Sequence, residues 1–227
     1  MEISYLSHSC FKIVTNDLHI IFDPFISPNE SATSIKVDDL KADYIFLSHA
    51  HADHIADVEK IYANNQATLV SNWEIITWYQ NKKNYDRVHP MNHGGKWKFD
   101  FGTVKMVNAV HSSSFPDGTY GGNPAGFVFE SEGITFYYAG DTALSYDMQL
   151  IKEDYSIDFA FMPIGDNFTM DIGDALKAAE FVGTSKIIAM HFDTFPYIKI
   201  DHEKAKKLAF ESKKELLLLN IGEKINL

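Results

Sequence analysis

The sequence predicts an α+β fold, an αββα four-layer sandwich in which two packed mixed β-sheets carry helices on their outer faces. The main observation is a succession of β-type segments followed by alternating strands and helices, which occurs twice, once before and once after the turn at 121–124. The 227 residues are 45% hydrophobic and 22% charged, which is typical of a globular protein with a full core. We therefore expect residues 1–227 to form a single domain.

The first half of the chain begins with a strand meander. Residues 10–15 and 19–23 are separated by Asn16-Asp17, a pair typical of a tight hairpin turn. The polar segment 27–39 predicts a surface loop. Apolar runs predict strands at 2–6, 10–15, 19–23, 44–47 and 67–70. Helices are predicted from about 54 to 63 and around 73–81.

The second half contains more β-type segments. Strands are predicted at 96–99, 103–110, 125–130, 134–139, 158–162, 186–190 and 216–220, the last of which would close the chain. A helix is predicted over 172–182, because its apolar residues recur at helical spacing and Gly183 follows as a stop signal. A last helix is predicted from the apolar stripe Ala205, Leu208 and Ala209.

Composition excludes several classes of function. Thirty-one acidic and twenty basic residues give a formal charge of −11, which disfavours nucleic acid as a partner. Cys10 is the only cysteine and has no internal disulfide partner, as expected in a reducing compartment. No apolar run approaches the roughly 18–20 residues of a membrane span, and the first residues lack the features of a signal peptide. We expect a cytoplasmic protein with no membrane partner.

The most informative segment is His49-Ala-His51-Ala-Asp53-His54, which directly follows a predicted strand. Residues two apart in an extended strand point the same way, so His49 and His51 can meet at one point. Asp53 and His54 fall on the turn into the following helix and can face a second point nearby. Imidazole and carboxylate groups suit zinc and similar divalent ions. We interpret the cluster as a metal site, against the alternative of a solvated polar turn.

Three further candidate ligands come at the ends of predicted strands in the second half. His111, Asp141 and His191 each follow an apolar segment of strand character. Strands that end together place their last residues on one rim, where sites of mixed β/α proteins tend to lie. We therefore expect these three side chains to join the early cluster.

In this order, these residues resemble the ligand set of the metallo-β-lactamase superfamily, and the resemblance covers essentially the whole chain. Shorter segments resemble the small branch of metal-dependent hydrolases that is similar to ascorbate-phosphate lactonases. These segments are Ser7-His8-Ser9, Ala109-Val110-His111-Ser112-Ser113, Pro163-Ile164-Gly165, Asn167-Phe168-Thr169-Met170, Met190-His191-Phe192 and Thr194-Phe195-Pro196. They are specific for the branch but not for a substrate.

The resemblance implies two divalent metal ions, zinc first, with manganese, nickel and iron as alternatives. His49, His51 and His111 would hold one ion, Asp53, His54 and His191 would hold the other, and Asp141 would bridge them. A metal-bridging hydroxide, oriented by Asp53, would attack a carbonyl or phosphoryl centre. The two ions outweigh the carboxylates and the hydroxide, so the site would favour a small anionic lactone, ester, thioester or phosphoester.

Other polar residues are expected around this centre. In the resembling branch the segment of His8 lies by the pocket, so His8 is expected to contact substrate or protonate the leaving group, unless it is a structural histidine. Asp23, which ends the third predicted strand, is expected to orient a ligand histidine or to serve as a turn residue before Pro24. Asn123, Asn167 and Thr169 are expected to line the mouth of the pocket.

The alternative function is a phosphodiesterase or ribonuclease of the same superfamily, which the −11 charge and the lack of room for a substrate-clamping domain disfavour. A redox role like that of di-iron relatives is a second alternative. Those relatives have a pattern in which Glu takes the place of the second histidine. This chain has His51 at that position. The expected partner is a small-molecule substrate, whose identity stays open, as does the formation of a homo-oligomer.

Overall fold

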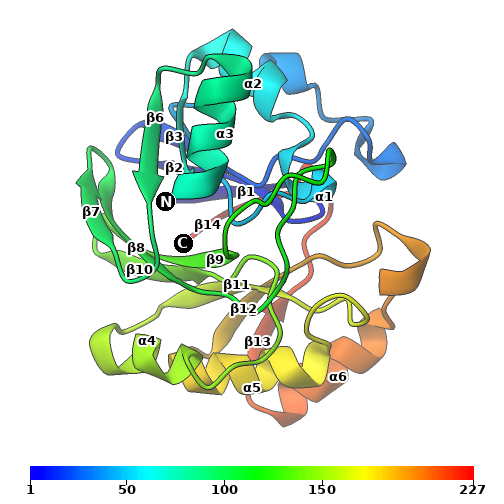
Figure 1. The fold of residues 1–227 in the computed structure, drawn as a ribbon. Helices are drawn as coiled ribbons and strands as arrows, with labels where there is room; N and C mark the ends of the chain where they lie inside the picture. The colour runs from blue at the N-terminus through cyan, green and yellow to red at the C-terminus, as the bar shows by residue number, and fades with distance from the viewer.

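The computed structural model describes residues 1–227 and confirms the sandwich of two seven-stranded sheets with helices outside (Figure 1). The first sheet has the spatial order β14-β1-β2-β3-β4-β5-β6. Its strands are β1 (Glu2–Ser7), β2 (Cys10–Thr15), β3 (Leu18–Phe22), β4 (Tyr44–Phe46), β5 (Thr68–Asn72), β6 (Val88–Met91) and β14 (Lys224–Asn226).

The second sheet has the spatial order β13-β12-β11-β10-β9-β8-β7. Its strands are β7 (Lys96–Phe99), β8 (Gly102–Asn108), β9 (Ala125–Ser131), β10 (Ile134–Tyr138), β11 (Phe159–Pro163), β12 (Lys186–Met190) and β13 (Glu215–Leu217). Outside the first sheet lie α2 (Val58–Asn65) and α3 (Trp73–Lys83), and outside the second lie α4 (Met148–Asp154), α5 (Ile172–Val182) and α6 (His202–Glu211). Short turns complete the chain: α1 (Ala52–Ile55) and the 3₁₀ helices at Glu30–Ala32, Val37–Asp39 and Pro196–Ile198.

Both sheets are built in the same way. Three or four antiparallel strands form a meander, and the chain then adds parallel strands, from β3 through β6 in one sheet and from β10 through β13 in the other. Parallel neighbours need crossover connections, and helices supply most of them. Strands β1, β3 and β4 run in one direction, as do β8, β10, β11 and β12. Their carboxyl ends therefore gather at one edge of each sheet.

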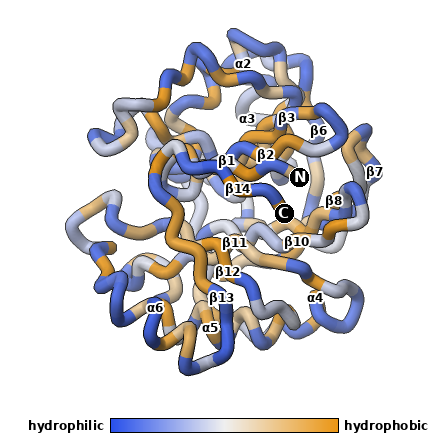
Figure 2. Tube along the Cα trace, turned by 180° about the vertical axis from the view of Figure 1, so that it is seen from behind, coloured by the Kyte–Doolittle hydropathy of each residue, from blue (hydrophilic) through white to orange (hydrophobic).

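Alternation along the strands divides the first sheet between two cores. Ile21, Ile45 and Leu69 pack under α2 and α3, whereas Phe22 and Phe46 pack against the second sheet. Figure 2 shows the result as hydrophobic central strands between outer helices that carry both kinds of residue. The hairpin turn predicted at Asn16-Asp17 is confirmed, because both residues have the positive φ angles, 49° and 60°, that tight hairpins require.

The end of the chain differs from the prediction. The strand predicted over 216–220 is confirmed only at its start, because β13 spans Glu215–Leu217 and the chain then returns to the first sheet. There β14 pairs antiparallel with β1, Glu2 opposite Asn226. The turn between the two sheets includes Gly222, whose φ of 87° suits glycine and whose N–H donates to Tyr5 O at 2.8 Å. Three residues of β14 are too few to show an alternating pattern in the sequence.

The helix predicted from about 54 to 63 is broken into α1 and α2. The backbone N–H of Asp57 donates to Pro24 O at 3.0 Å instead of continuing a helical ladder. The Asp57 carboxylate accepts the N–H groups of Ile26 at 2.6 Å and Ser27 at 2.9 Å. A contact with the loop after β3 therefore outweighs local helix propensity.

Two elements were not predicted, strand β6 and helix α4. Strand β6 contains Pro90 and lies at the edge of its sheet, where a proline is tolerated.

No helix of the structure combines the length and the apolar character that crossing a membrane requires.

The core between the sheets is made of aromatic rings. Phe129 of β9 lies 4.9 Å from Phe46 and 5.2 Å from Phe22, ring centre to ring centre, and 4.8 Å from Phe136 in its own sheet. All four rings are fully buried. Edge-to-face packing across the sheets therefore fixes the distance between them, and with it the distance between residues at the strand ends of one sheet and those of the other.

We expect Phe129→Ala to lower the free energy of unfolding by about 3–5 kcal/mol, because it leaves a cavity between the sheets. Phe210→Ala is the matched control, since that ring is 82% exposed on α6 and its loss should change stability little. Denaturant unfolding measures both changes, and equal stability of the two variants would contradict the packing described.

Candidate metal centre

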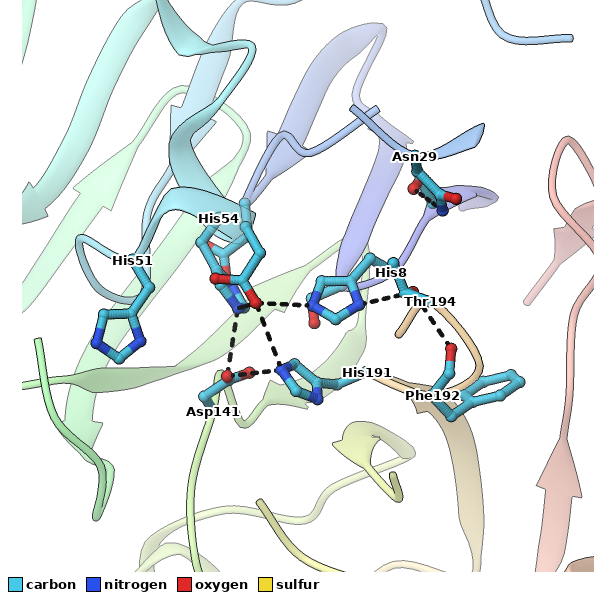
Figure 3. Close-up of polar contacts among 12 residues, drawn as sticks. His8, Asn29, His51, His54, Asp141, His191, Phe192 and Thr194 are labelled. Carbon is cyan, nitrogen blue, oxygen red and sulfur yellow. Dashed lines mark hydrogen bonds and ion pairs between the residues drawn. The ribbon is translucent and has the colours of Figure 1, made fainter. Parts of the chain in front are cut away.

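The predicted ligands lie at the edge where the carboxyl ends of the strands gather. His49 and His51 follow β4, and Asp53 and His54 belong to α1 directly after it. In the second sheet, His111, Asp141 and His191 follow β8, β10 and β12. The structure brings all seven side chains to one place between the two sheets. Figure 3 shows His54, Asp141 and His191 of this set pointing toward one another.

Asp141 lies at the middle of the cluster. Its Oδ2 atom is 2.9 Å from His191 Nε2, 3.3 Å from His54 Nε2, 3.6 Å from His111 Nε2 and 3.9 Å from His49 Nε2. The carboxylate therefore touches histidines from both sheets, and from both of the two predicted ligand groups. This is the position that a bridging ligand requires.

The first group consists of His49, His51 and His111, whose nitrogen atoms lie within 4.8 Å of one another. His49 Nε2 and His51 Nδ1 are 3.0 Å apart. Ligand atoms about 2.1 Å from one cation lie roughly 3.0–3.4 Å apart, so this spacing fits a shared ion. The alternation along the extended segment after β4 turns both rings to the same side, as the sequence predicts.

The second group consists of Asp53, His54 and His191, and the structure adds His8 to it. Asp53 Oδ2 lies 3.8 Å from His191 Nε2 and 4.0 Å from His54 Nε2. His8 Nε2 lies 3.3 Å from the same oxygen. His8 is fully buried, so its ring faces the cluster and not the solvent.

Asp23 orients the early histidines through four hydrogen bonds. Its carboxylate accepts the N–H of Ser48 at 2.8 Å, the Ser48 hydroxyl at 2.6 Å, the Tyr138 hydroxyl at 2.8 Å and His54 Nδ1 at 2.9 Å. Ser48 Oγ also contacts His49 Nδ1 at 2.9 Å. Because the hydroxyl donates to Asp23, it accepts from His49 Nδ1–H. Both histidines therefore keep Nδ1 in these hydrogen bonds and turn Nε2 toward the cluster.

The donor set fits a metal ion. His54 Nε2 and Asp141 Oδ1 are buried and have no hydrogen-bond partner, as is also true of His8 Nε2. Burying such atoms without a partner is costly, and a cation bound between them removes that cost. Neutral imidazoles with carboxylates are the ligands that zinc and related divalent ions prefer.

The pKa values of the carboxylates reflect the surrounding imidazoles. Burial acts to raise the pKa of Asp141, but His191 and His54 outweigh it and hold the value well below its usual range. Burial likewise acts to raise the pKa of Asp53, and His54 and His8 outweigh it. Both carboxylates are therefore ionised at neutral pH and available to a cation.

The histidines divide into two classes. Burial lowers the pKa of His49, and it lowers that of His8 to about 4, so both rings are neutral near pH 7. Burial also acts to lower the pKa of His54, but the carboxylates of Asp141, Asp23 and Asp53 outweigh it and raise the value. A bound cation would take the place of the proton that these carboxylates attract to His54.

The residues expected at the mouth of the pocket make no hydrogen bond to the cluster. The exposed Asn123 side chain accepts the Tyr120 hydroxyl at 2.9 Å. Asn167 is exposed in a turn with a φ of 54°, and Thr169 Oγ1 is buried without a partner. Their role at the mouth stays a prediction.

Sequence reasoning missed Ser48, Tyr138 and Thr194, which position the histidines. Ser48 and Tyr138 bond to Asp23, and Thr194 Oγ1 lies 2.9 Å from His8 Nδ1. The signals in the sequence are that Ser48 directly precedes His49 and that Thr194 begins the branch segment Thr194-Phe195-Pro196. The Ser113 hydroxyl, close to His111 in the sequence, donates to Gly121 O at 3.0 Å and accepts Ala50 N–H at 3.2 Å.

Known proteins resemble this chain over its full length. The model of the beta-lactamase superfamily domain matches residues 19–192. A UPF0173 metal-dependent hydrolase of Flavobacterium johnsoniae is 56% identical over 227 residues, and one of Christiangramia forsetii is 53% identical over 228 residues, each covering 100% of both chains.

Solved structures share the fold. Igni18, a metallo hydrolase from Ignicoccus hospitalis, superposes with a TM-score of 0.88 at 30% identity, covering 99% of this chain and 97% of its own. An isothiocyanate hydrolase from Delia radicum gut bacteria has a TM-score of 0.78 at 18% identity, covering 100% of this chain and 99% of its own. The second likeness concerns the fold alone.

We expect Asp23→Ala to lower the free energy of unfolding by about 3–5 kcal/mol, because it leaves His54 and Ser48 without their buried partner. It should also weaken Zn²⁺ binding about 10–100-fold, since His54 loses its orientation. Denaturant unfolding and metal titration measure the two effects.

Tyr138→Phe is the control, since it removes one donor to Asp23 and keeps the bond to His54, and it should cost only about 1 kcal/mol. Wild-type zinc affinity in Asp23→Ala would contradict the orienting role.

Proposed function

This chain belongs to the beta-lactamase superfamily and, within it, to the UPF0173 metal-dependent hydrolases, and from that premise we propose a specific activity. We propose that residues 1–227 form one hydrolase domain that cleaves a small anionic lactone, ester, thioester or phosphoester at a centre for two divalent cations. The observation that carries the proposal is the position of Asp141 Oδ2, within 4.0 Å of four imidazole nitrogen atoms from two ligand groups.

The two groups divide the ligands as follows. His49, His51 and His111 would hold one cation, Asp53, His54 and His191 would hold the other, and Asp141 would belong to both. Zinc is the first choice because nitrogen ligands dominate, and manganese, nickel and iron suit the same residues. Bound there, a pair of divalent cations makes hydroxide available near neutral pH and stabilises negative charge on a substrate oxygen.

Asp53 is the residue best placed to act on the reacting groups. Its side chain is 27% exposed, whereas Asp141, His54 and His191 are buried. Its ionised carboxylate can accept a hydrogen bond from the attacking water or hydroxide and hold it in line with the substrate. Solvent also reaches His111, so substrate would approach from the side of Asp53 and His111.

The charge of the centre favours an anionic substrate. The chain carries a formal charge of −11, but the cluster contains only the carboxylates of Asp53 and Asp141 facing its ligand histidines, with Asp23 behind them. Two divalent cations exceed the charge of Asp53, Asp141 and a hydroxide by one, and the Asp23 carboxylate lies behind His54, on the side of Nδ1. This positive charge attracts an anionic substrate and stabilises the negative charge that develops during hydrolysis.

Protein purified without added metal should contain two equivalents of divalent ion per chain by elemental analysis. It should hydrolyse one class among lactones, thioesters and phosphodiesters, and removing the metal with a chelator should abolish turnover and lower the melting temperature. A chain that carries no more than one equivalent at full activity would contradict a two-cation centre.

We expect Asp53→Ala to lose at least about 100-fold in kcat with an unchanged circular dichroism spectrum, because the orienting carboxylate is missing and the fold does not depend on it. Asp154→Ala, which removes an exposed carboxylate at the end of α4, is the matched control with wild-type turnover. Near-normal kcat in Asp53→Ala would refute the assigned role.

A further inference from the structure

We propose that His8 Nε2 is an additional ligand of the cation at Asp53, His54 and His191. The inference rests on the proposed two-cation function and deepens it. It gives that cation five protein ligands, with Asp141, in place of four. The sequence-based expectation for His8 is contact with substrate or proton donation, and three observations favour the cation instead.

The first observation is that the backbone holds His8 beside His191. His8 lies in the turn between β1 and β2 with a φ of 51°, a left-handed conformation that costs free energy for a residue other than glycine. Its carbonyl accepts the N–H of His191 at 3.1 Å and the Tyr5 hydroxyl at 3.2 Å. The two rings lie 4.2 Å apart, centre to centre. A strained turn is thus bonded directly to a predicted ligand of the other sheet.

The second observation is the hydrogen bonding of the other ring nitrogen. His8 Nδ1 lies 2.9 Å from Thr194 Oγ1, and that hydroxyl donates to Phe192 O at 3.3 Å (Figure 3). A hydroxyl has one proton, and while Thr194 donates it to Phe192 O it can only accept from His8 Nδ1–H. This assigns the proton to Nδ1 and leaves a lone pair on Nε2, the arrangement that metal-ligating histidines show.

The third observation is what Nε2 faces. It lies 3.3 Å from Asp53 Oδ2, within 4.8 Å of the ligand atoms of His54 and His191, and it makes no hydrogen bond. With the proton on Nδ1, two acceptors face each other in buried surroundings, which is unfavourable unless a cation lies between them. His8 is 0% exposed, so its Nε2 is turned to this space and away from any substrate in solvent.

A fifth protein ligand would change which metal ion each position prefers. The group of three histidines with Asp141 offers four ligands, which suits tetrahedral zinc. Five protein ligands at the other position exceed a tetrahedral set and favour an ion that accepts five or six, such as Mn²⁺, Fe²⁺ or Ni²⁺. We therefore expect the two positions to differ in metal selectivity.

The test is titration of metal-free protein with Co²⁺, followed by proton NMR and absorption spectroscopy. Each imidazole bound through Nε2 keeps an Nδ1–H whose NMR signal the paramagnetic ion shifts strongly. The wild type should bind two equivalents and show such a signal from His8. His8→Ala should lose that one signal, bind the second Co²⁺ at least about 10-fold more weakly, and show stronger visible absorption as the coordination number falls.

Two further variants complete the design. His202→Ala removes an exposed histidine on α6 and should keep every wild-type signal. Thr194→Val keeps His8 and should retain its shifted signal with faster exchange of the proton, so the proposal stays testable if His8→Ala fails to fold. An unchanged set of shifted signals in His8→Ala, with wild-type affinity, overturns the proposal. Fewer than two equivalents in the wild type instead contradicts the two-cation function, and the proposal with it.

Discussion

The candidate centre depends on one buried carboxylate. Asp141 follows strand β10 of the second sheet, and its Oδ2 meets imidazoles from His49 and His54 on the side of the first sheet and from His111 and His191 on its own side. A carboxylate without solvent around it is stable only when positive charge or hydrogen-bond donors compensate it. A cation or bound protons must therefore compensate the charge of Asp141 at the edge where the two sheets meet.

Core packing and site geometry are coupled through Tyr138 and Asp23. The Tyr138 ring stacks on Phe22 at 4.6 Å between the sheets, and its hydroxyl donates to Asp23, which accepts His54 Nδ1–H. A shift of one sheet against the other would move this chain of contacts and turn the His54 ring. Because the close-packed interior is stiff, it holds the side chains of the site in the orientation that binding a cation requires.

Much of this arrangement could be predicted because it follows from strand direction and alternation. The pattern His49-x-His51 after a strand, and single polar residues after the strands at 134–138 and 186–190, indicate convergence at one edge. The break before α2 could not be predicted, because Asp57 bonds to residues of the loop after β3. The return of β14 to the first sheet could not be predicted either, because its three residues pair with β1 at the opposite end of the chain.

The sequence by itself determined the chemical types of the candidate ligands, their order and the fold that carries them, because those depend on local patterns. Only the tertiary structure decided which nitrogen of each ring faces the centre. That choice is made by Ser48 for His49, by Asp23 for His54 and by Thr194 for His8. Thr194 is separated from His8 by 186 positions, and it reaches that ring only after the two sheets have packed. A hydrogen bond between such distant segments has no signature in either segment alone.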